Sequence, residues 1–492
     1  MDKGNRPGML RPDTDTLRQL SANYSVIPIC REIHADIITP ISLLRRLAGI
    51  SQRYFLLESV EGGEKWGRYS FLGFDPVLRV YGQQGHMTIE RDGAIIHLDT
   101  GKPLEMLREI QAAYKSPRLP DMPPFSGGLV GYFGYAMIGY AEPQLKIKRG
   151  DHNDFDLMLF DQVIAFDHLR QKICLVVNIP TDHLDYEKAA ARLESLAGLI
   201  RDPRPLPGLK SDRSVSFASN VTLEEYCAMV NHTKEYISEG DIFQAVISRQ
   251  FQAPYYSSLL NAYRVLRTTN PSPYMVYMHI DGDEIMSTSP ETLVRLQQGR
   301  LTTFPVAGSR PRGKTEAEDQ QMEKELLADE KELAEHNMLV DLGRNDLGRI
   351  SKYGTVKVSE YMVIHRYSTI MHICSQVDSE IIPGGDAYSA IEAVLPAGTL
   401  SGAPKIRACE IIEEIETVPR GIYGGALGYV DFTGNMDTCI AIRMAVKKGD
   451  VVYVQAGGGI VADSIPEQEY EESGYKAMAV INAIRNAGEV DY

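Results

Sequence analysis

Cysteine is scarce and scattered in this chain. The 492 residues contain six cysteines and no Cys-x-x-Cys pair, at Cys30, Cys174, Cys227, Cys374, Cys409 and Cys439. Disulfide frameworks and thiolate metal sites typically show cysteines at short, regular spacings, so these scattered positions indicate free thiols in a reducing compartment. The first twenty residues are polar and contain proline, and they lack the apolar core of a signal peptide. We therefore expect a cytoplasmic protein.

Long apolar runs and an excess of positive charge are also lacking. No apolar run reaches the ~18 residues that a membrane span requires. Acidic residues outnumber basic residues by 66 to 51, which gives a net charge of −15. This charge repels phosphate backbones and anionic lipids, so we expect neither a nucleic-acid partner nor a membrane partner. With 43% hydrophobic and 24% charged residues, the composition is that of a globular protein.

One proline-rich segment, 201–208, divides the chain. It carries three prolines, which are excluded from helix interiors and central strands. Before it, short strand patterns such as 53–59 alternate with glycine and proline; beyond it, strands and helices alternate without a clear second break. The sequence therefore predicts an N-terminal portion over 1–208, linker included, and a C-terminal portion over 209–492.

The segment 438–446 has strict strand alternation. One face is expected to carry Ile440, Ile442, Met444 and Val446, and the other Cys439, Ala441, Arg443 and Ala445. Small residues around a lone arginine leave room for an anion, and the guanidinium fork suits a carboxylate. A structural salt bridge is the alternative. A second strand pattern, 451–459, ends in three glycines that would expose backbone amides to a ligand.

An acidic segment, 316–341, reads as one helix with an apolar stripe. Glu332 and Glu335 lie beside apolar neighbours, where a carboxylate pair is costly without a cation or hydrogen-bond donors. Further carboxylates follow the glycine strand at Glu469, Glu471 and Glu472. Hard oxygen ligands from two segments suit Mg²⁺. Solvated surface acids are the alternative.

Two glycine-rich segments imitate nucleotide-binding motifs. Residues 308–315 satisfy the P-loop pattern GxxxxGK[ST], but Pro311 removes one of the amides that would cradle a phosphate. The Walker B-like segment 338–341 falls within a helical pattern, where a strand would be needed. Residues 127–134 lack the GxGxxG spacing and are better explained as a packed glycine and aromatic strand. A nucleotide-binding module is therefore a weak alternative.

Five motifs occur in the order found in the chorismate-utilising enzymes. They are PVAGSRPRG (305–313), DEKELAEHNMLVD (329–341), RND (344–346), LPAGTLSGAPK (395–405) and QAGGG (455–459). The chain resembles this family from about residue 55 to residue 484, and within it the large subunits (component I) of the anthranilate synthases. The resemblance implies an α+β fold, a layered α/β sandwich of largely antiparallel sheets flanked by helices.

The same resemblance implies an activity and a set of site residues. The activity is the conversion of chorismate and ammonia to anthranilate and pyruvate with Mg²⁺, the first step of tryptophan biosynthesis. Glu335 and Glu472 are implied as Mg²⁺ ligands, His372 as a catalytic residue, and Glu291 as the acid for the departing 4-hydroxyl. The implied chorismate contacts are Gly308, Ser309, Tyr423, Arg443, Gly457, Gly458 and Gly459.

The resemblance also implies regulation and a partner. Ser59, Pro273, Tyr274 and Met275 match the family's tryptophan site, so feedback inhibition by L-tryptophan is expected. No cysteine lies in a Gly-x-Cys-x-Gly nucleophile loop. A separate glutamine amidotransferase subunit (component II) is therefore implied as the ammonia source, in a heterotetramer.

Two positions separate the chain from its sister enzymes. Aminodeoxychorismate synthases typically carry lysine where this chain has Ala307, and the isochorismate and salicylate synthases place a lysine base where it has Gln244. An uncharged glutamine cannot be that base, whereas ammonia is already a nucleophile. Both positions favour anthranilate synthesis. An aminodeoxychorismate or aminodeoxyisochorismate synthase and an idle tryptophan-sensing subunit are the alternatives.

Overall fold

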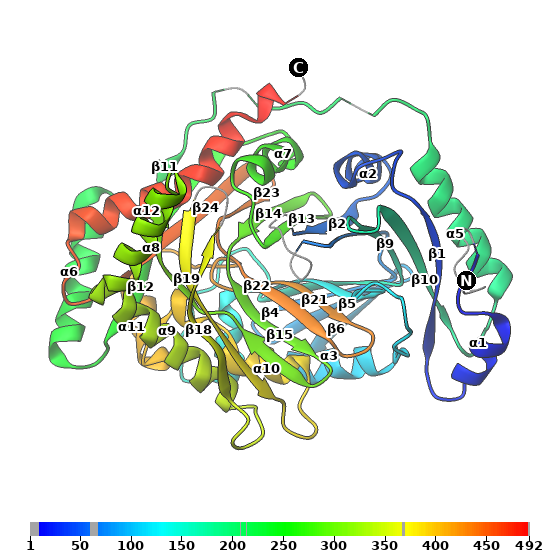
Figure 1. Cartoon of the computed structure of the whole chain (residues 1–492), viewed down its shortest axis with the longest axis horizontal. Coiled ribbons are helices and arrows are strands. Elements are labelled where there is room, and N and C mark those ends of the chain that lie inside the picture. Colours follow the sequence, from blue (N-terminus) through cyan, green and yellow to red (C-terminus); the bar gives the residue numbers. More distant parts are fainter. Residues whose placement is uncertain (1–8, 60–66, 207, 213, 367–369, 491–492) are drawn as a thin grey trace.

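Two large antiparallel sheets form the centre of the molecule (Figure 1). The computed structural model describes residues 9–59, 67–206, 208–212, 214–366 and 370–490. Each sheet has twelve strands among these residues. Helices cover the outer faces of the two sheets, so the predicted α+β class, a layered sandwich of antiparallel sheets, is confirmed.

The strands and helices have the following bounds. The first sheet contains, in spatial order, β1 (Val26–His34), β10 (Lys172–Pro180), β9 (Gln162–Asp167), β3 (Tyr69–Phe74), β2 (Arg53–Glu58), β13 (Tyr274–Ile280), β14 (Asp283–Ser289), β23 (Met444–Lys448), β24 (Val451–Ile460), β12 (Gln244–Pro254) and β11 (Ala218–Ser219), with β20 (Gly402–Ala403) beside β12. The second sheet contains β17 (Val306–Pro311), β19 (Ile370–Glu380), β16 (Arg300–Thr303), β15 (Thr292–Gln297), β22 (Met436–Ile440), β21 (Ala426–Asp431), β7 (Gly128–Phe133), β8 (Phe155–Phe160), β4 (Leu78–Gln83), β5 (His86–Arg91) and β6 (Ala94–Asp99), with β18 (Lys357–Arg366) beside β19. The α-helices are α1 (Thr14–Leu20), α2 (Pro40–Leu47), α3 (Pro103–Ala112), α4 (Ile138–Ala141), α5 (Tyr186–Arg201), α6 (Leu223–Glu239), α7 (Leu260–Thr269), α8 (Glu316–Ala328), α9 (Glu330–Gly348), α10 (Ala387–Val394), α11 (Lys405–Ile415) and α12 (Pro466–Arg485).

Strand alternation creates the layers. In β2, Tyr54 and Leu56 join a core that includes residues of α2, α5, α7 and α12. The intervening Phe55 and Leu57 face the other way and join a core built from both sheets. The outer face of the second sheet packs against α3, α9 and α10. Among the helices of the described ranges, none combines the length and apolar character that crossing a membrane demands.

The proline-rich segment 201–208 connects elements of shared sheets. It begins at Arg201, the last residue of α5, and precedes β11. Strand β2, from before the segment, pairs with β13 from after it, and β7 likewise pairs with β21. The portions 1–208 and 209–492 therefore contribute strands to both sheets, and a cavity between them can be lined from both.

The segment 438–446 is not the single strand that its alternation predicts. Strand β22 ends at Ile440 in the second sheet, and β23 begins at Met444 in the first. The chain crosses between the sheets at 441–443, where Arg443 has a left-handed backbone conformation (φ +48°). Ala441 pairs through its backbone with Gly424 and Gly425 instead of continuing the ladder. The prediction of a single strand was wrong. Side-chain alternation shows which residues share a face, but it does not show whether the chain passes from one sheet to another.

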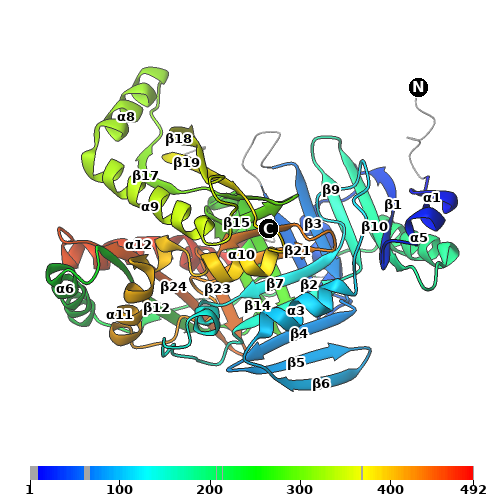
Figure 2. The ribbon, with the colours of Figure 1, turned by 90° about the horizontal axis from the view of Figure 1, so that it is seen from below.

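The acidic segment 316–341 forms two helices rather than the predicted one. Asp329 separates α8 from α9, and its side chain accepts hydrogen bonds from the backbone N–H groups of Lys331 and Glu332. Aspartate is a strong N-cap, so it starts a new helix where the apolar stripe alone indicated continuity. With β17, β18 and β19, these helices form an arm that stands out from the body of the molecule (Figure 2).

The two imitations of nucleotide motifs fold as the sequence predicts. Residues 338–341 lie inside α9, so the Walker B-like segment is helical. The glycine-rich segment forms the buried strand β7. The P-loop-like segment begins in strand β17 and continues to Thr315, which caps α8. The arrangement does not support a phosphate-binding loop.

Candidate active site

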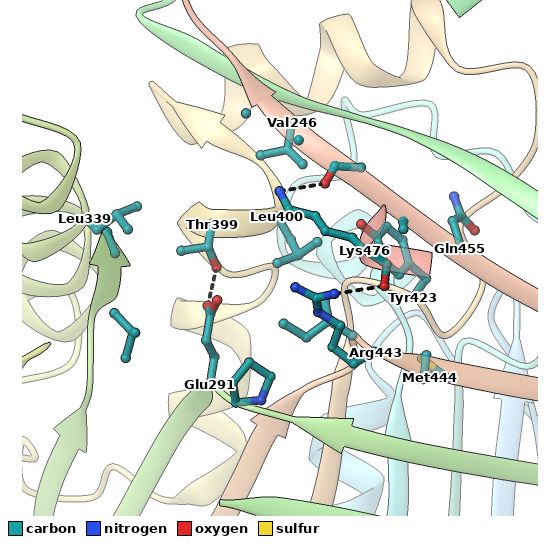
Figure 3. A pocket seen from close by; sticks show the side chains of 18 of the residues that line it. Val246, Glu291, Leu339, Thr399, Leu400, Tyr423, Arg443, Met444, Gln455 and Lys476 are labelled. Carbon is teal, nitrogen blue, oxygen red and sulfur yellow. Dashed lines mark hydrogen bonds between the residues drawn. The ribbon is translucent and has the colours of Figure 1, made fainter. Parts of the chain in front are cut away.

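One cavity collects most of the predicted chorismate and metal residues. This first cavity, of about 170 Å³, lies where β12, β23 and β24 meet helices α9 and α12 (Figure 3). Seven predicted residues line it: Glu291, Glu335, Tyr423, Arg443, Gly457, Gly458 and Gly459. They come from segments up to 168 positions apart, and only the crossing of sheets and helices brings them together.

Arg443 supplies a cation inside the first cavity. Its left-handed backbone turns the side chain inward after the chain leaves β22, and Nη1 donates to the carbonyl oxygen of Lys476 over 2.8 Å. Burial lowers the pKa of Arg443, while the nearby Glu291 carboxyl raises it. A desolvated guanidinium is a favourable partner for an anionic ligand, because that ligand restores the interactions lost from water.

The glycines of β24 are required by packing as well as by the cavity. A Cβ on Gly457 would lie 2.2 Å from the carbonyl oxygen of Ile247, and one on Gly459 would lie 1.9 Å from Nε2 of Gln244. At Gly457 a Cβ would therefore clash with the backbone of β12, whereas at Gly459 it would meet the end of a flexible side chain. Gly458 has more room, since its nearest neighbour would be Glu469 Oε2 at 3.0 Å.

Glu291 is placed to act as a proton donor. It lies just before β15, and its Oε2 accepts a hydrogen bond of 3.0 Å from Thr399 Oγ1. Burial raises the pKa of Glu291, with a further increase from the charge of Glu335. A carboxyl group with a raised pKa keeps its proton at higher pH than an exposed one, which is the property of a general acid.

His372 pairs with Ser309 in the β17–β19 ladder and does not line the first cavity. It is on β19 opposite β17, and its Nδ1 is 3.2 Å from the carbonyl oxygen of Gly308. A carbonyl only accepts, so the proton is on Nδ1 and Nε2 is the basic nitrogen of the neutral ring. Burial lowers the pKa of His372, which keeps the ring neutral. These three residues are outside the lining of the cavity in the described structure; their neighbour Ala307 is within it.

The predicted metal ligands come from two helices. Glu335, on α9, lines the cavity, and Glu472, on α12, pairs with Lys476 at 2.7 Å. The pKa of Glu335 is raised by burial and by the charges of Glu332 and Glu472. A divalent cation would relieve this repulsion, and Mg²⁺ takes one or two carboxylates together with water and substrate oxygens. The donor set therefore fits Mg²⁺.

The other acidic side chains are not arranged around a metal. Glu332 pairs with Arg310 at 3.4 Å instead of facing the cavity. Within the described ranges, no group of three or more histidine, cysteine, aspartate or glutamate side chains has a metal-binding arrangement. A Mg²⁺ site here would therefore depend on oxygen atoms of the ligand.

Three polar lining residues were not singled out in the sequence analysis. Lys476, Thr399 and Gln455 line the first cavity, and Figure 3 labels all three. Lys476 Nζ donates to the carbonyl oxygen of Gly457 over 3.2 Å. Lys476 could have been expected near the site from the sequence, because it follows Glu472 by four residues and therefore lies on the same helix face. Thr399 and Gln455 lie inside the motifs at 395–405 and 455–459.

A second cavity contains all four predicted tryptophan contacts. It measures about 280 Å³ and is lined by Ser59, Pro273, Tyr274 and Met275. Strands β2 and β13 of the first sheet and β21 and β22 of the second contribute to its wall, as do aromatic and charged side chains. Among these are Glu58, Arg68, Phe71, Arg295, Tyr429 and Asp437.

Comparison with known proteins identifies the family. Residues 53–482 match the model of the chorismate binding enzymes. This match covers most of the chain, and the chain therefore belongs to the chorismate binding enzyme family.

Individual relatives share almost the full length. The chain is 46% identical to anthranilate synthase component 1 of Acetivibrio thermocellus over 98% of its own residues and 100% of the relative's. It is 45% identical to the protein of that name in Aquifex aeolicus over 96% and 98% of the two chains. The solved structure of anthranilate synthase component I from Streptococcus pneumoniae matches with a TM-score of 0.77 and 36% identity, over 91% and 98%. The menaquinone-specific isochorismate synthase of Escherichia coli, at 20% identity and a TM-score of 0.68, shares the fold, over 96% and 98%.

Proposed function

We propose that this chain is the large subunit of an anthranilate synthase, converting chorismate and ammonia to anthranilate and pyruvate in the first step of tryptophan biosynthesis. The observation that carries the proposal is the first cavity, where Arg443, Glu291 and the carboxylate of Glu335 converge. Chorismate has two carboxylates and a hydroxyl leaving group, which these side chains can bind and protonate. The name shared by the relatives, at about 45% identity over nearly full length, supports this choice within the family.

Each residue of the first cavity would have its own role in the reaction. Arg443 would pair with one carboxylate of chorismate, and Tyr423 and the glycines of β24 would enclose the ring. Glu335 and Glu472 would hold Mg²⁺, which supplies positive charge for the other carboxylate. Glu291 would give its proton to the departing 4-hydroxyl as ammonia adds at C2. Nε2 of His372 would then accept the C2 proton as the ether bond to the enolpyruvyl group breaks, and the released enolate would take up a proton to become pyruvate.

The second cavity is proposed as the site of feedback inhibition by L-tryptophan. Phe71 and Tyr429 offer aromatic faces to an indole ring. Asp437 and Arg295 line the same space and carry charges complementary to an amino acid's ammonium and carboxylate groups. The cavity is formed by other strand ends than those of the first, so inhibition would act at a distance.

A glutamine amidotransferase subunit is the proposed partner. The sequence contains no Gly-x-Cys-x-Gly loop, and all six cysteines are free thiols. Ammonia would therefore be released from glutamine by component II, in a cytoplasmic heterotetramer. Without that subunit, we expect the chain to use ammonium and not glutamine.

The test is product formation by the purified chain. Chorismate, MgCl₂ and ammonium chloride are incubated at mildly alkaline pH, and anthranilate is followed by fluorescence and chromatography. We expect anthranilate with ammonium and none with glutamine alone. Arg443→Lys, which keeps the charge and loses the fork, should raise the KM for chorismate. An amino product that keeps its enolpyruvyl group would assign a sister synthase, and no turnover of chorismate would refute the proposal.

A further inference from the structure

Tyr274 links the second cavity to the segment that carries Glu291. Its ring lines the second cavity, while its backbone pairs with Ser289 in the β13–β14 ladder. Its Oη lies 3.0 Å from Thr292 Oγ1. Tyr274 therefore holds the chain on both sides of Glu291, two residues before it and one residue after it.

The direction of these hydrogen bonds follows from the donors and acceptors present. Tyr274 has one hydroxyl proton and donates it to Asp437 Oδ1 over 2.7 Å, since a carboxylate only accepts. Arg295 completes the cluster, donating from Nε to Asp437 Oδ2 at 3.1 Å and from Nη2 to Tyr274 Oη at 3.2 Å. The hydroxyl of Thr292 is therefore the donor to Tyr274.

Thr292 itself lies between the two cavities. The residue is 5% exposed. It lines a smaller cavity of about 40 Å³, which shares Glu291 and Thr399 with the first cavity. A change at Thr292 therefore removes no contact that a ligand would make in either of the larger cavities.

The Glu291 side chain accepts a hydrogen bond from Thr399. Its backbone is held by Ile440, whose N–H donates to the Glu291 carbonyl oxygen over 3.0 Å, and by the Ser289 hydroxyl, which bonds the same carbonyl at 3.3 Å and the Glu291 N–H at 3.4 Å. The β15–β22 ladder shifts register between Thr292 and Val294, so the regular backbone pairing is interrupted next to Glu291. Close packing transmits small displacements, so movement of Tyr274 Oη would reach Glu291 through a single residue.

We propose that Thr292 is a positioning residue that couples the two cavities. A ligand that contacts Tyr274 in the second cavity pulls the Thr292 hydroxyl through their hydrogen bond, and this movement turns Glu291 away from its position in the first cavity. This inference rests on the proposed function, in which L-tryptophan fills the second cavity and Glu291 is the proton donor. Coupling between sites typically changes affinity by about 5- to 150-fold. The hydrogen bond from Thr292 to Tyr274 carries that coupling.

The decisive variant is Thr292→Val, which keeps the shape and removes the hydroxyl. L-tryptophan binding is measured by calorimetry, and the KM and kcat for chorismate with ammonium are measured with and without saturating tryptophan. We expect an unchanged Kd for tryptophan and a loss of most of its effect on KM and kcat. Thr292→Ser should restore inhibition. Thr438→Val is the matched control, because Thr438 is also buried and donates one hydrogen bond, to the carbonyl of Val294 at 2.8 Å.

Tyr274→Phe provides a second, independent test. It keeps the ring in the second cavity and removes Oη, so inhibition should be lost as in Thr292→Val; it decides the question if Thr292→Val does not fold. Full inhibition in these variants, with normal tryptophan binding, would overturn the coupling role and leave the proposed function intact. Failure of the wild-type chain to bind tryptophan would instead remove the proposed inhibitor, and this inference with it.

Discussion

Replacing Arg420 by methionine should damage both stability and chorismate binding. Arg420 and Glu416 form an ion pair behind the first cavity, with side chains 1% and 4% exposed. Arg420 donates to both carboxylate oxygens of Glu416, at 2.9 and 2.6 Å. It also donates to the carbonyl oxygens of Val246 and Leu400, two residues that line the first cavity. One buried side chain thus ties together two segments of the cavity wall.

The magnitude follows from what remains after the substitution. Glu416 would be left as a buried carboxylate without its cation, which costs about 3–5 kcal/mol of the free energy of unfolding. Each of the two carbonyls would also lose a donor, at about 1–3 kcal/mol for a buried unsatisfied group. These losses share one side chain and are not additive, so we take about 3 kcal/mol as the lower bound.

The assay is urea unfolding of Arg420→Met, Glu416→Leu and the double variant, with the KM for chorismate measured on each. The double variant removes the uncompensated charge and should recover part of the stability lost in Arg420→Met. Its KM should stay high, since Val246 and Leu400 still lack their donor. A loss below about 3 kcal/mol in Arg420→Met, or no recovery in the double variant, would refute the reasoning.

Three further predictions follow from the same structure. Gly459→Ala should raise the KM for chorismate, because its Cβ displaces a flexible glutamine amide toward the cavity; Gly457→Ala meets a backbone carbonyl and should instead lower the free energy of unfolding by about 1–3 kcal/mol. Glu335→Gln should raise the MgCl₂ concentration needed for half-maximal activity, while Glu332→Gln, which changes a side chain outside the cavity lining, should leave it near wild type. Burial lowers the pKa of His336 from 6.5 to about 4, so the unfolded chain takes up the proton first as the pH falls. The contribution of the neutral ring to stability is therefore complete above pH 6.5, and the free energy of unfolding should decrease by about 2 kcal/mol between pH 7 and pH 5. His336→Gln should abolish this decrease in urea unfolding.

The locations of the two cavities follow closely from the sequence motifs. The strand ending in three glycines, the arginine before it and the acidic helix all reach the first cavity, since each motif combines a local backbone shape with a particular donor or acceptor. Ser59 and Tyr274 also share a cavity, although 215 positions separate them. Their meeting was inferred from family resemblance, because nothing in either local pattern refers to the other.

The errors arose where one local pattern was taken to be one element although the structure divides it. The alternation of 438–446 is consistent with two short strands, but only the pairing of its two ends with different sheets places the crossing at 441–443. Asp329 is compatible with a helix interior by spacing, and its capping hydrogen bonds decide the break. Lys476 was missed because its role depends on Gly457 of a neighbouring strand.

By itself the sequence determined the family, the layered class of fold, and the residue types available for binding an anion and moving a proton. The family and the class of fold were implied by the resemblance that the ordered motifs carry, and the residue types follow from local patterns in the chain. Tertiary structure alone decided that Arg443 enters the cavity by a turn between sheets, that Arg420 and Glu416 hold the cavity wall, and that one threonine lies between Glu291 and the second cavity. Those relations join side chains from separate strands, and close packing of the two sheets determines them, so no local pattern in the sequence records them.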